Sequence, residues 1–177
     1  MNHPWHDIDP GKPDTPLAFI EIPSGTKIKY ELHKESGFMV ADRIMYTSFV
    51  YPFNYGFIPR SLAKDGDPMD CFVMGEELLP MTMVRIRPLG LLQMSDQGKK
   101  DDKLLAVPVA DPRFEQVKDL KDVGPHLIKE LEHFLTHYKD LEHKQTVVMD
   151  WMGRPEAIKA IEESLVSYVA SGVRKKA

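Results

Sequence analysis

The sequence predicts an α+β fold, in which a small β-barrel or sandwich is covered by helices. Two observations indicate this class. Residues 17–109 contain apolar segments with strand character, separated by turns that contain Gly and Pro. After residue 125 the apolar residues take the spacing of amphipathic helices. Strands in series followed by helices are typical of α+β proteins, and a compact Greek-key barrel is the arrangement we favour.

The strand prediction is clearest over residues 27–33, where polar and apolar residues alternate strictly. Ile28, Tyr30 and Leu32 fall on one face of this strand, and charged residues or His fall on the other. Further strands are predicted wherever β-branched and other apolar residues gather between turn residues. These strands cover residues 17–22, 39–45, 83–94, 104–109 and 145–151.

Two helices are predicted in the last third of the chain, each with four apolar residues on one stripe. Pro125 suits the first turn of the earlier helix, and the later helix is expected to begin at Pro155 and end at Gly172. The stripes are Leu127, Leu131, Phe134 and Tyr138 in the first helix, and Ile158, Ile161, Leu165 and Val169 in the second.

Composition limits the class of protein. The 177 residues are 42% hydrophobic, which suits one well-buried domain over residues 1–177. A net charge of −4, with acids and bases mixed, argues against a nucleic-acid partner held mainly by its phosphates. The lone cysteine, Cys71, cannot form an internal disulfide and fits a reducing compartment. With neither a leader nor a bilayer-length apolar run, we expect a soluble cytoplasmic protein without a membrane partner.

The most informative segment is an acidic turn with three carboxylates in six residues, Asp65-Gly66-Asp67-Pro68-Met69-Asp70. Gly and Pro keep this segment from forming a helix. Two carboxylates about 5 Å apart repel by roughly 3 kcal/mol at an effective dielectric near 20. Full solvation or a bound hard cation would relieve that repulsion, and the turn alone leaves both open. An EF-hand loop that begins at Asp65 is excluded, because its sixth position must be Gly and is Asp70 here.

A second acidic turn covers residues 95–103 and includes Asp96 and Asp101. Alone it is an ordinary polar hairpin loop. Because it ends a neighbouring strand, it could meet the first acidic turn. A site with oxygen ligands alone would select Mg²⁺, Mn²⁺ or Ca²⁺ over zinc. His133 and His137 lie one helical turn apart, but a zinc site needs further nitrogen or sulfur ligands, so a solvated or subunit-contact face is the simpler interpretation.

Taken together, these segments resemble family I soluble inorganic pyrophosphatase of the short bacterial type. The acidic turn at residues 65–71 matches the signature of that family, and ordered matches run from about residue 17 to residue 142. They include residues 20–23, 28–31, 42–43, 51–52, 54–56, 96–103, 106–108 and 137–142. The resemblance implies a five-stranded, OB-like closed β-barrel with flanking helices. It also implies Mg²⁺-dependent hydrolysis of pyrophosphate to two phosphates by direct in-line attack of a metal-activated water.

The resemblance implies that carboxylates hold several Mg²⁺ ions, for which Mn²⁺ or other divalent ions could substitute. Asp65, Asp70 and Asp101 would hold the first ion, with Asp70 bridging to a second. Asp96, Asp101 and Glu31 would serve ions that arrive with the substrate. The residue after Asp96 is often acidic in the family and is Gln97 here, which should weaken that binding slightly.

The remaining roles implied by the resemblance concern the substrate and the assembly. Asp67 would accept a proton from the attacking water, and Glu21 would shape the pocket. A homohexamer is implied, with subunit contacts near His133, His137 and Asp140. The residues that would bind the substrate are Lys29, Arg43, Tyr55, Lys103, Tyr138 and Lys139.

Two other functions compete with an enzyme. An OB-type nucleic-acid binder should have a basic groove with exposed stacking aromatics, whereas the loops of this chain gather acids. A metal-buffering protein would use the aspartates but would leave Lys29, Arg43 and Lys139 without a purpose. The enzyme is therefore the preferred interpretation.

Overall fold

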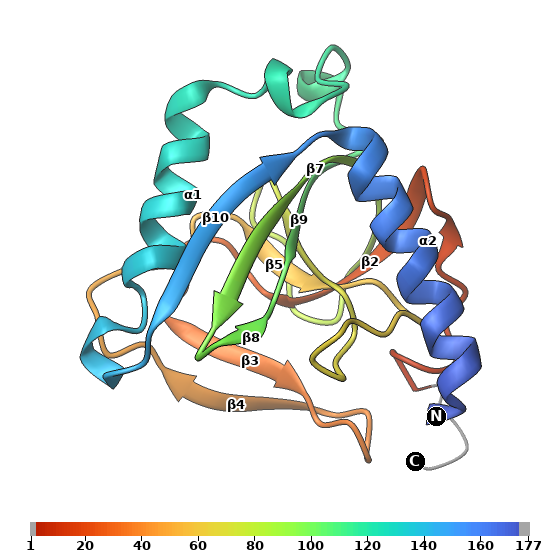
Figure 1. Ribbon diagram of the computed structural model, residues 1–177, viewed down its shortest axis with the longest axis horizontal. Coiled ribbons are helices and arrows are strands. Elements are labelled where there is room, and N and C mark those ends of the chain that lie inside the picture. Colours follow the sequence, from red (N-terminus) through yellow and green to blue (C-terminus); the bar gives the residue numbers. More distant parts are fainter. Residues whose placement is uncertain (1–2, 174–177) are drawn as a thin grey trace.

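The computed structural model describes residues 3–173 (Figure 1). An eight-stranded mixed sheet forms the centre, a two-stranded hairpin lies at one end of it, and two long helices flank it. The strands are β1 Gly11–Lys12, β2 Thr15–Ile22, β3 Ile28–Leu32, β4 Met39–Ile44, β5 Asn54–Phe57, β6 Asp70–Val73, β7 Met83–Asp96, β8 Lys99–Lys100, β9 Lys103–Pro108 and β10 Thr146–Met152. The helices are α1 Pro125–His137 and α2 Arg154–Ser171, with short 3₁₀ turns at Pro112–Phe114, Leu120–Asp122 and Asp140–Glu142.

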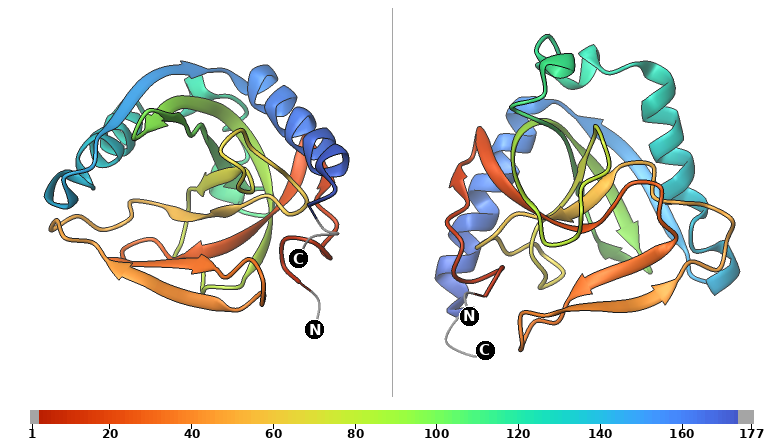
Figure 2. Two further views of the ribbon diagram at one scale, coloured as in Figure 1. Left: turned by 60° about the horizontal axis from the view of Figure 1, so that its bottom comes forward. Right: turned by 180° about the vertical axis from the view of Figure 1, so that it is seen from behind.

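The sheet is organised around β7, its longest strand. The strand order is β1-β2-β5-β6-β9-β7-β10, β8 pairs with β7, and β2 also pairs with β7. Most of these pairings are antiparallel, whereas β6 and β9 run parallel. The β3–β4 hairpin lies beside the end of the sheet where β7 terminates (Figures 1 and 2). This end therefore brings the second acidic turn close to the hairpin.

The core fills both sides of the sheet, so that β2 and β9 are buried almost throughout. Helix α1 buries Leu131, Phe134 and Leu135 against aromatic and aliphatic residues of the strands. Helix α2 packs through Ala157 and Ile161 onto a second apolar cluster. Among residues 3–173, neither helix combines the length and the apolar character needed to cross a bilayer.

The N-terminal segment is tied to both the end of α2 and the loop before β6. Trp5 is buried in one cluster with Tyr168, and their ring centroids are 6.0 Å apart. The indole Nε1 of Trp5 donates to the carbonyl oxygen of Ser61 at 2.8 Å. The hydroxyl of Ser61 in turn accepts from the backbone N–H of Met69 at 2.7 Å. The first acidic turn is thus braced from behind by residues near the start of the chain.

The predicted α+β class with two C-terminal helices is confirmed, but the sheet is larger than the five strands expected. All six predicted strands are present, as β2, β3, β4, β7, β9 and β10. Strands β5 and β6, and the two-residue strands β1 and β8, were not predicted. Most of β5 lies within the family-matched segment at residues 54–56, where a Cβ on Gly56 would lie 1.9 Å from the carbonyl oxygen of Phe19. Only glycine therefore permits β2 and β5 to approach this closely.

The helix limits agree with the sequence, since Pro125 and Pro155 lie in the first turns and Gly172 ends α2 with a φ of 63°. The apolar stripe of α2 was partly wrong, because Val169 is 79% exposed. The buried face of this helix instead follows Ala157, Ile161, Ser164 and Tyr168. This face is turned by about one residue from the predicted stripe, so Ala157, Ser164 and Tyr168 are buried where Ile158, Leu165 and Val169 were expected.

Candidate active site

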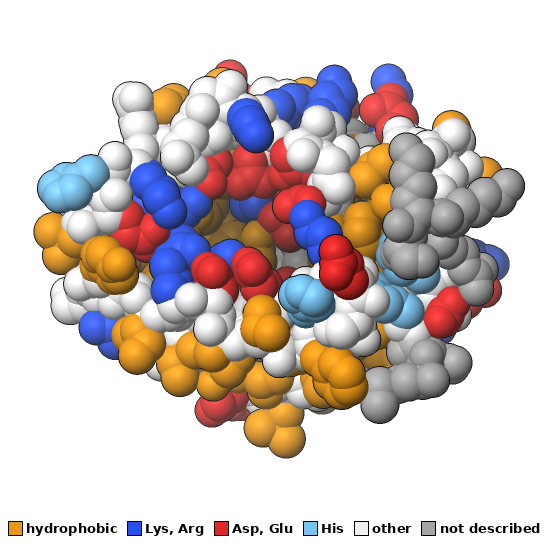
Figure 3. Space-filling view, turned by 90° about the horizontal axis from the view of Figure 1, so that it is seen from below, with side chains coloured by type: hydrophobic (Ala, Val, Ile, Leu, Met, Phe, Trp, Pro, Cys, Tyr) orange, Lys and Arg blue, Asp and Glu red, His pale blue; other side chains and the backbone are white. Residues whose placement is uncertain are grey.

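The two acidic turns and the segment after α1 face one cavity of about 540 Å³. Figure 3 shows this face of the molecule, with a hollow rimmed by acidic and basic side chains. Most of the predicted site residues line the cavity: Asp65, Asp67, Asp70, Asp96 and Asp101 among the carboxylates, Lys29, Lys103 and Lys139 among the cations, and Tyr55 and Tyr138. Residues separated by more than 100 positions in the chain are therefore brought together.

The first acidic turn folds around Gly66, whose φ of 95° lies in the region that favours glycine. The Asp65 carboxylate accepts a hydrogen bond from the backbone N–H of Asp67 at 3.0 Å. Asp70 is the first residue of β6, so it is fixed by the sheet rather than by the loop. The Asp67 carboxylate is in contact with the ammonium group of Lys34, which comes from the turn of the β3–β4 hairpin.

The second acidic turn is a tight hairpin between β7 and β8. Its central residues, Gln97 and Gly98, have φ angles of 50° and 80°, as a two-residue type I′ turn requires. The chain then folds back, and the N–H of Asp101 donates to the carbonyl oxygen of Met94 at 2.9 Å. This return places Asp101 on the same cavity wall as Asp96.

Lys103 joins the two acidic turns. The parallel pairing of Cys71 with Leu104 sets Asp70 beside Lys103, one residue earlier on each strand. The ammonium group of Lys103 lies 2.5 Å from carboxylate oxygens of both Asp70 and Asp101. Burial alone would lower the pKa of Lys103, but the two carboxylates outweigh it and raise the pKa. Lys103 is therefore a fixed cation in the floor of the site.

Lys139 is placed differently, because a single carboxylate faces it. It is buried directly after α1 and forms an ion pair with Asp96. Burial lowers the pKa of Lys139, and the pair with Asp96 offsets this only in part. The other oxygen of that carboxylate, Oδ1, is buried and has no hydrogen-bond partner among residues 3–173. Burial also raises the pKa of the neighbouring Tyr138, so its hydroxyl stays protonated at neutral pH.

A second cavity, of about 440 Å³, adjoins the first and shares Lys29, Tyr55, Asp67 and Asp70 with it. Glu21 and Glu31 line this second cavity. The Glu31 carboxylate lies 2.5 Å from the ammonium group of Lys29.

Glu21 is almost completely buried at the wall of this second cavity. Its carboxylate accepts the backbone N–H of Leu32 at 2.8 Å. Burial, with the charge of Asp70, raises the pKa of Glu21 to about 8.

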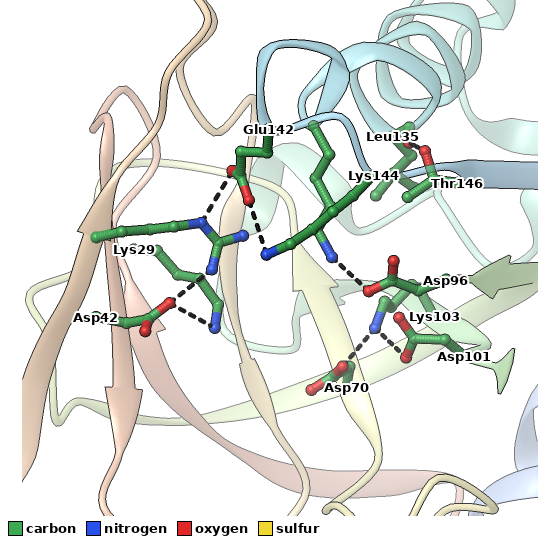
Figure 4. A network of polar contacts seen from close by, with 12 residues as sticks. Lys29, Asp42, Asp70, Asp96, Asp101, Lys103, Leu135, Glu142, Lys144 and Thr146 are labelled. Atoms are coloured by element: carbon green, nitrogen blue, oxygen red, sulfur yellow. Dashed lines mark hydrogen bonds and ion pairs between the residues drawn. The ribbon is translucent and has the colours of Figure 1, made fainter. Parts of the chain in front are cut away.

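Arg43 is the one predicted substrate-binding residue that lies outside the lining of both cavities. It is on β4, directly opposite Lys29 on β3. Its Nη1 donates to Asp42 at 2.6 Å, and Asp42 also accepts from Lys29 at 3.3 Å. Its Nε donates to Glu142 at 2.9 Å, in the network drawn in Figure 4. Arg43 is thus held at the edge of the site by two acids.

The His pair on α1 does not form a zinc site. The rings of His133 and His137 are 4.8 Å apart, and His137 contacts Asp140 at 2.9 Å. Across residues 3–173, no three His, Cys, Asp or Glu side chains lie close enough to make a ready-formed metal site. In the acidic cavity, Lys103 and Lys139 are inserted among the carboxylates.

Sequence reasoning gave no role to Lys34, Asp42 or Glu142, which contact predicted site residues. Alternation places Asp42 on the strand next to Arg43, but nothing local indicates that it pairs with Lys29. The contacts of Lys34 and Glu142 join positions 33 and 99 residues apart. Only the packing of the hairpin against the rest of the chain brings these residues to the site.

Comparison with known proteins gives a consistent result. The sequence model of the inorganic pyrophosphatase family matches residues 18–169. A soluble inorganic pyrophosphatase of Chlamydomonas reinhardtii is 46% identical over 99% of this chain and 93% of its own length. One from Arabidopsis thaliana is 45% identical over 94% of this chain and 80% of its own length.

Solved structures agree with these relatives. An inorganic pyrophosphatase from Coxiella burnetii, 41% identical, superposes with a TM-score of 0.88 over 91% of this chain and 99% of that one. The enzyme from Thermus thermophilus, 33% identical, gives a TM-score of 0.90 over 95% and 99%. The acidic cavity thus lies in a chain that belongs to the inorganic pyrophosphatase family and is a hydrolase of the phosphoanhydride bond.

Proposed function

We propose that this enzyme hydrolyses inorganic pyrophosphate to two phosphates, with Mg²⁺ as its cofactor and by direct attack of water. The observation that carries the proposal is the convergence of five aspartates and four lysines on one cavity. Carboxylates suit divalent cations, and lysines suit phosphate oxygens. A site that holds both can receive a metal-bound, multiply charged phosphate anion.

The residues of the cavity fit Mg²⁺ by their chemistry. The facing groups are carboxylates, without a His or Cys cluster, and oxygen donors are the ligands that Mg²⁺ prefers. The buried Asp96 Oδ1 has no partner within the described part of the chain, and a cation would satisfy it. We assign Asp65, Asp70 and Asp101 to the first ion, and Asp96, Asp101 and Glu31 to the ions that accompany substrate. Mn²⁺ would suit the same donors.

Bound divalent ions would supply two things, charge neutralisation on the phosphate oxygens and a lowered pKa for the attacking water. The other steps belong to the chain. Asp67 accepts the proton from the attacking water at a carboxylate oxygen. Its position in the lining of both cavities supports this role. The site offers no nucleophile–base arrangement of Ser, Cys or His in its lining, so a one-step displacement by water is favoured.

The cations hold the substrate. Lys29, Lys103 and Lys139 line the cavity from three different segments, and Arg43 lies at its edge, opposite Lys29 on the hairpin. Tyr55 and Tyr138 add hydroxyl donors from the wall. Glu21 shapes the adjoining cavity from its buried position. Binding of both phosphates by fixed cations would orient the bridging oxygen for in-line departure.

The test is phosphate release from pyrophosphate with and without added Mg²⁺, using a matched pair of variants in one turn. Asp101→Asn removes a carboxylate of the cavity, whereas Asp102→Asn changes its neighbour, which pairs with Lys100 instead. We expect Mg²⁺-dependent release by the natural chain and by Asp102→Asn, and a loss of about 100-fold or more in Asp101→Asn. Equal activity of the two variants, or no release at all, would reject the proposal.

We also infer that the chain forms an OB-like barrel in a single domain and is cytoplasmic, as the family resemblance implies. Strands β2, β5, β6, β9 and β7 form a ring of pairings, since β7 pairs with both β9 and β2, and this supports an OB-like barrel. Residues near both ends of the described chain share one apolar cluster, which supports a single domain over residues 1–177. The lone, buried Cys71 supports a cytoplasmic location.

We propose, from the family resemblance, a homohexamer with pyrophosphate as substrate and without nucleic-acid or membrane partners. His133 is exposed on α1, and the His137–Asp140 pair joins the end of α1 to the following 3₁₀ turn, a polar surface suited to a subunit contact. Sedimentation analysis of the natural chain and of His137→Ala tests this proposal. A monomeric natural chain would contradict it.

A further inference from the structure

Glu142 is a buried carboxylate to which the proposed mechanism gives no task. It ends the short 3₁₀ turn Asp140–Glu142 that follows α1, and its side chain is only 5% exposed. One of its oxygens accepts from Arg43 Nε at 2.9 Å, and the other accepts from Lys144 at 3.2 Å. Figure 4 shows Glu142 above the hairpin residues, pointing toward them.

The guanidinium of Arg43 is held at two of its edges. Glu142 binds Nε, and Asp42 binds Nη1 at 2.6 Å. Because the guanidinium is planar and rigid, two such contacts leave it a single orientation. Its third nitrogen, Nη2, makes no hydrogen bond with any residue from 3 to 173, so it is available to an anion.

The charges make Arg43 the principal partner of this carboxylate. Burial alone would raise the pKa of Glu142, but hydrogen bonds from Arg43 and Lys144 lower it overall, so the group is ionised at neutral pH. The Lys144 side chain is 41% exposed, whereas that of Arg43 is 21% exposed. Solvent therefore screens the Lys144 contact more strongly.

From these contacts we propose that Glu142 is a positioning residue, which fixes Arg43 so that its free nitrogen faces the phosphate of the substrate. The inference rests on the proposed function, in which Arg43 binds substrate. Glu142 also lies three residues after Lys139. The Glu142 side chain thus fixes the position of Arg43 relative to the segment that carries Tyr138 and Lys139, two further substrate-binding residues.

The test separates charge, orientation and fold. Glu142→Gln keeps the shape and loses the charge, and Glu142→Asp keeps the charge but withdraws it by one methylene. For both variants we expect KM for pyrophosphate to rise about tenfold while kcat stays within about threefold, as expected when a charged hydrogen bond is weakened. The affinity for inorganic phosphate, measured by calorimetry in the presence of Mg²⁺, should fall by a similar factor.

A double-mutant cycle with Arg43→Lys shows whether Glu142 acts through Arg43. In the Arg43→Lys background, Glu142→Gln should change KM by less than about twofold, because the group it positions is already absent. Lys144→Met, which removes only the exposed partner, should leave KM within about twofold of the natural value. Thermal unfolding of each variant verifies that it is folded.

Unchanged KM and phosphate affinity in both Glu142 variants would overturn the inference. Fully multiplicative effects of Glu142→Gln and Arg43→Lys would also overturn it, because they would show that the two residues act independently. If the natural chain releases no phosphate from pyrophosphate, the proposed function fails. The phosphate-binding comparison would then still decide whether Glu142 positions Arg43 for an anion.

Discussion

Lys103→Met should lower the free energy of unfolding, and added Mg²⁺ should restore much of that loss. The substitution removes the ammonium group that lies 2.5 Å from both Asp70 and Asp101, while the apolar side chain keeps most of the volume. The side chains of these two carboxylates are only 21% and 15% exposed, so they are left facing each other in a poorly solvated place. Removing one partner from a buried ion pair costs about 3–5 kcal/mol, and the partial exposure here favours the lower figure.

Mg²⁺ should reduce the difference in unfolding free energy between the natural chain and Lys103→Met, because it would supply the positive charge that Lys103 provided. In the natural chain the ion competes with Lys103 for the carboxylates of Asp70 and Asp101, whereas in Lys103→Met it does not. A narrowing of the stability difference from about 3 to about 1 kcal/mol corresponds to roughly 30-fold tighter Mg²⁺ binding by the variant. The two proteins thus differ in stability and in metal affinity for one electrostatic reason.

Urea unfolding followed by circular dichroism measures both effects, first in EDTA and then at increasing Mg²⁺. Lys100→Met is the control, because Lys100 is in the same loop but is 46% exposed and pairs with Asp102. It should cost less than about 1 kcal/mol at every Mg²⁺ concentration. A difference between Lys103→Met and the natural chain that stays constant as Mg²⁺ rises would refute the assignment of Asp70 and Asp101 as metal ligands.

Three further predictions follow from the site. Asp67→Asn should lower turnover about 100-fold or more with little change in Mg²⁺ affinity, because it removes a proton acceptor and keeps the shape; near-normal steady-state turnover would reject that role. Arg43→Lys should raise KM about tenfold although the charge is kept, since lysine cannot reproduce the planar donor set; unchanged kinetics would contradict the assigned contact. Glu21→Gln should gain stability relative to the natural chain as pH rises from about 5 to 8, reaching about 3 kcal/mol at pH 7 in EDTA. The raised pKa of Glu21 means that the natural folded state resists ionisation while the unfolded state does not, so its stability falls over this range. Urea unfolding at several pH values checks this, and a difference that does not vary with pH would show that Glu21 ionises freely.

Much of the fold could be predicted from the sequence because its signals are local. Strict alternation identified β3, and Pro at the start and Gly at the end located α2 to within a residue or two. Strands β5 and β6 were missed because each has four residues, too few for a period to emerge. Their place is set by neighbours, as the fit of Gly56 against Phe19 shows.

The candidate site was predicted in part for a related reason. The aspartates of the two turns are close in sequence within each turn, so their charge density is visible in the sequence itself. Which cation meets which carboxylate depends on strand register, as for Lys103 beside Asp70. The contacts of Lys34 and Glu142 depend on where the hairpin lies, and no local pattern records that. The family resemblance supplied roles that residue chemistry alone left open.

The hydrogen bond from Trp5 to Ser61 has a practical consequence for handling this enzyme. Proteolysis or truncation that removes the first few residues would leave every proposed catalytic group intact. It would nevertheless remove the indole that donates to the carbonyl oxygen of Ser61, the residue whose hydroxyl accepts from the N–H of Met69 in the first acidic turn. Loss of activity in a truncated preparation would then reflect weaker support of the first acidic turn, since no catalytic residue is missing. An affinity tag at the N-terminus therefore needs a spacer that leaves the Trp5 indole in place.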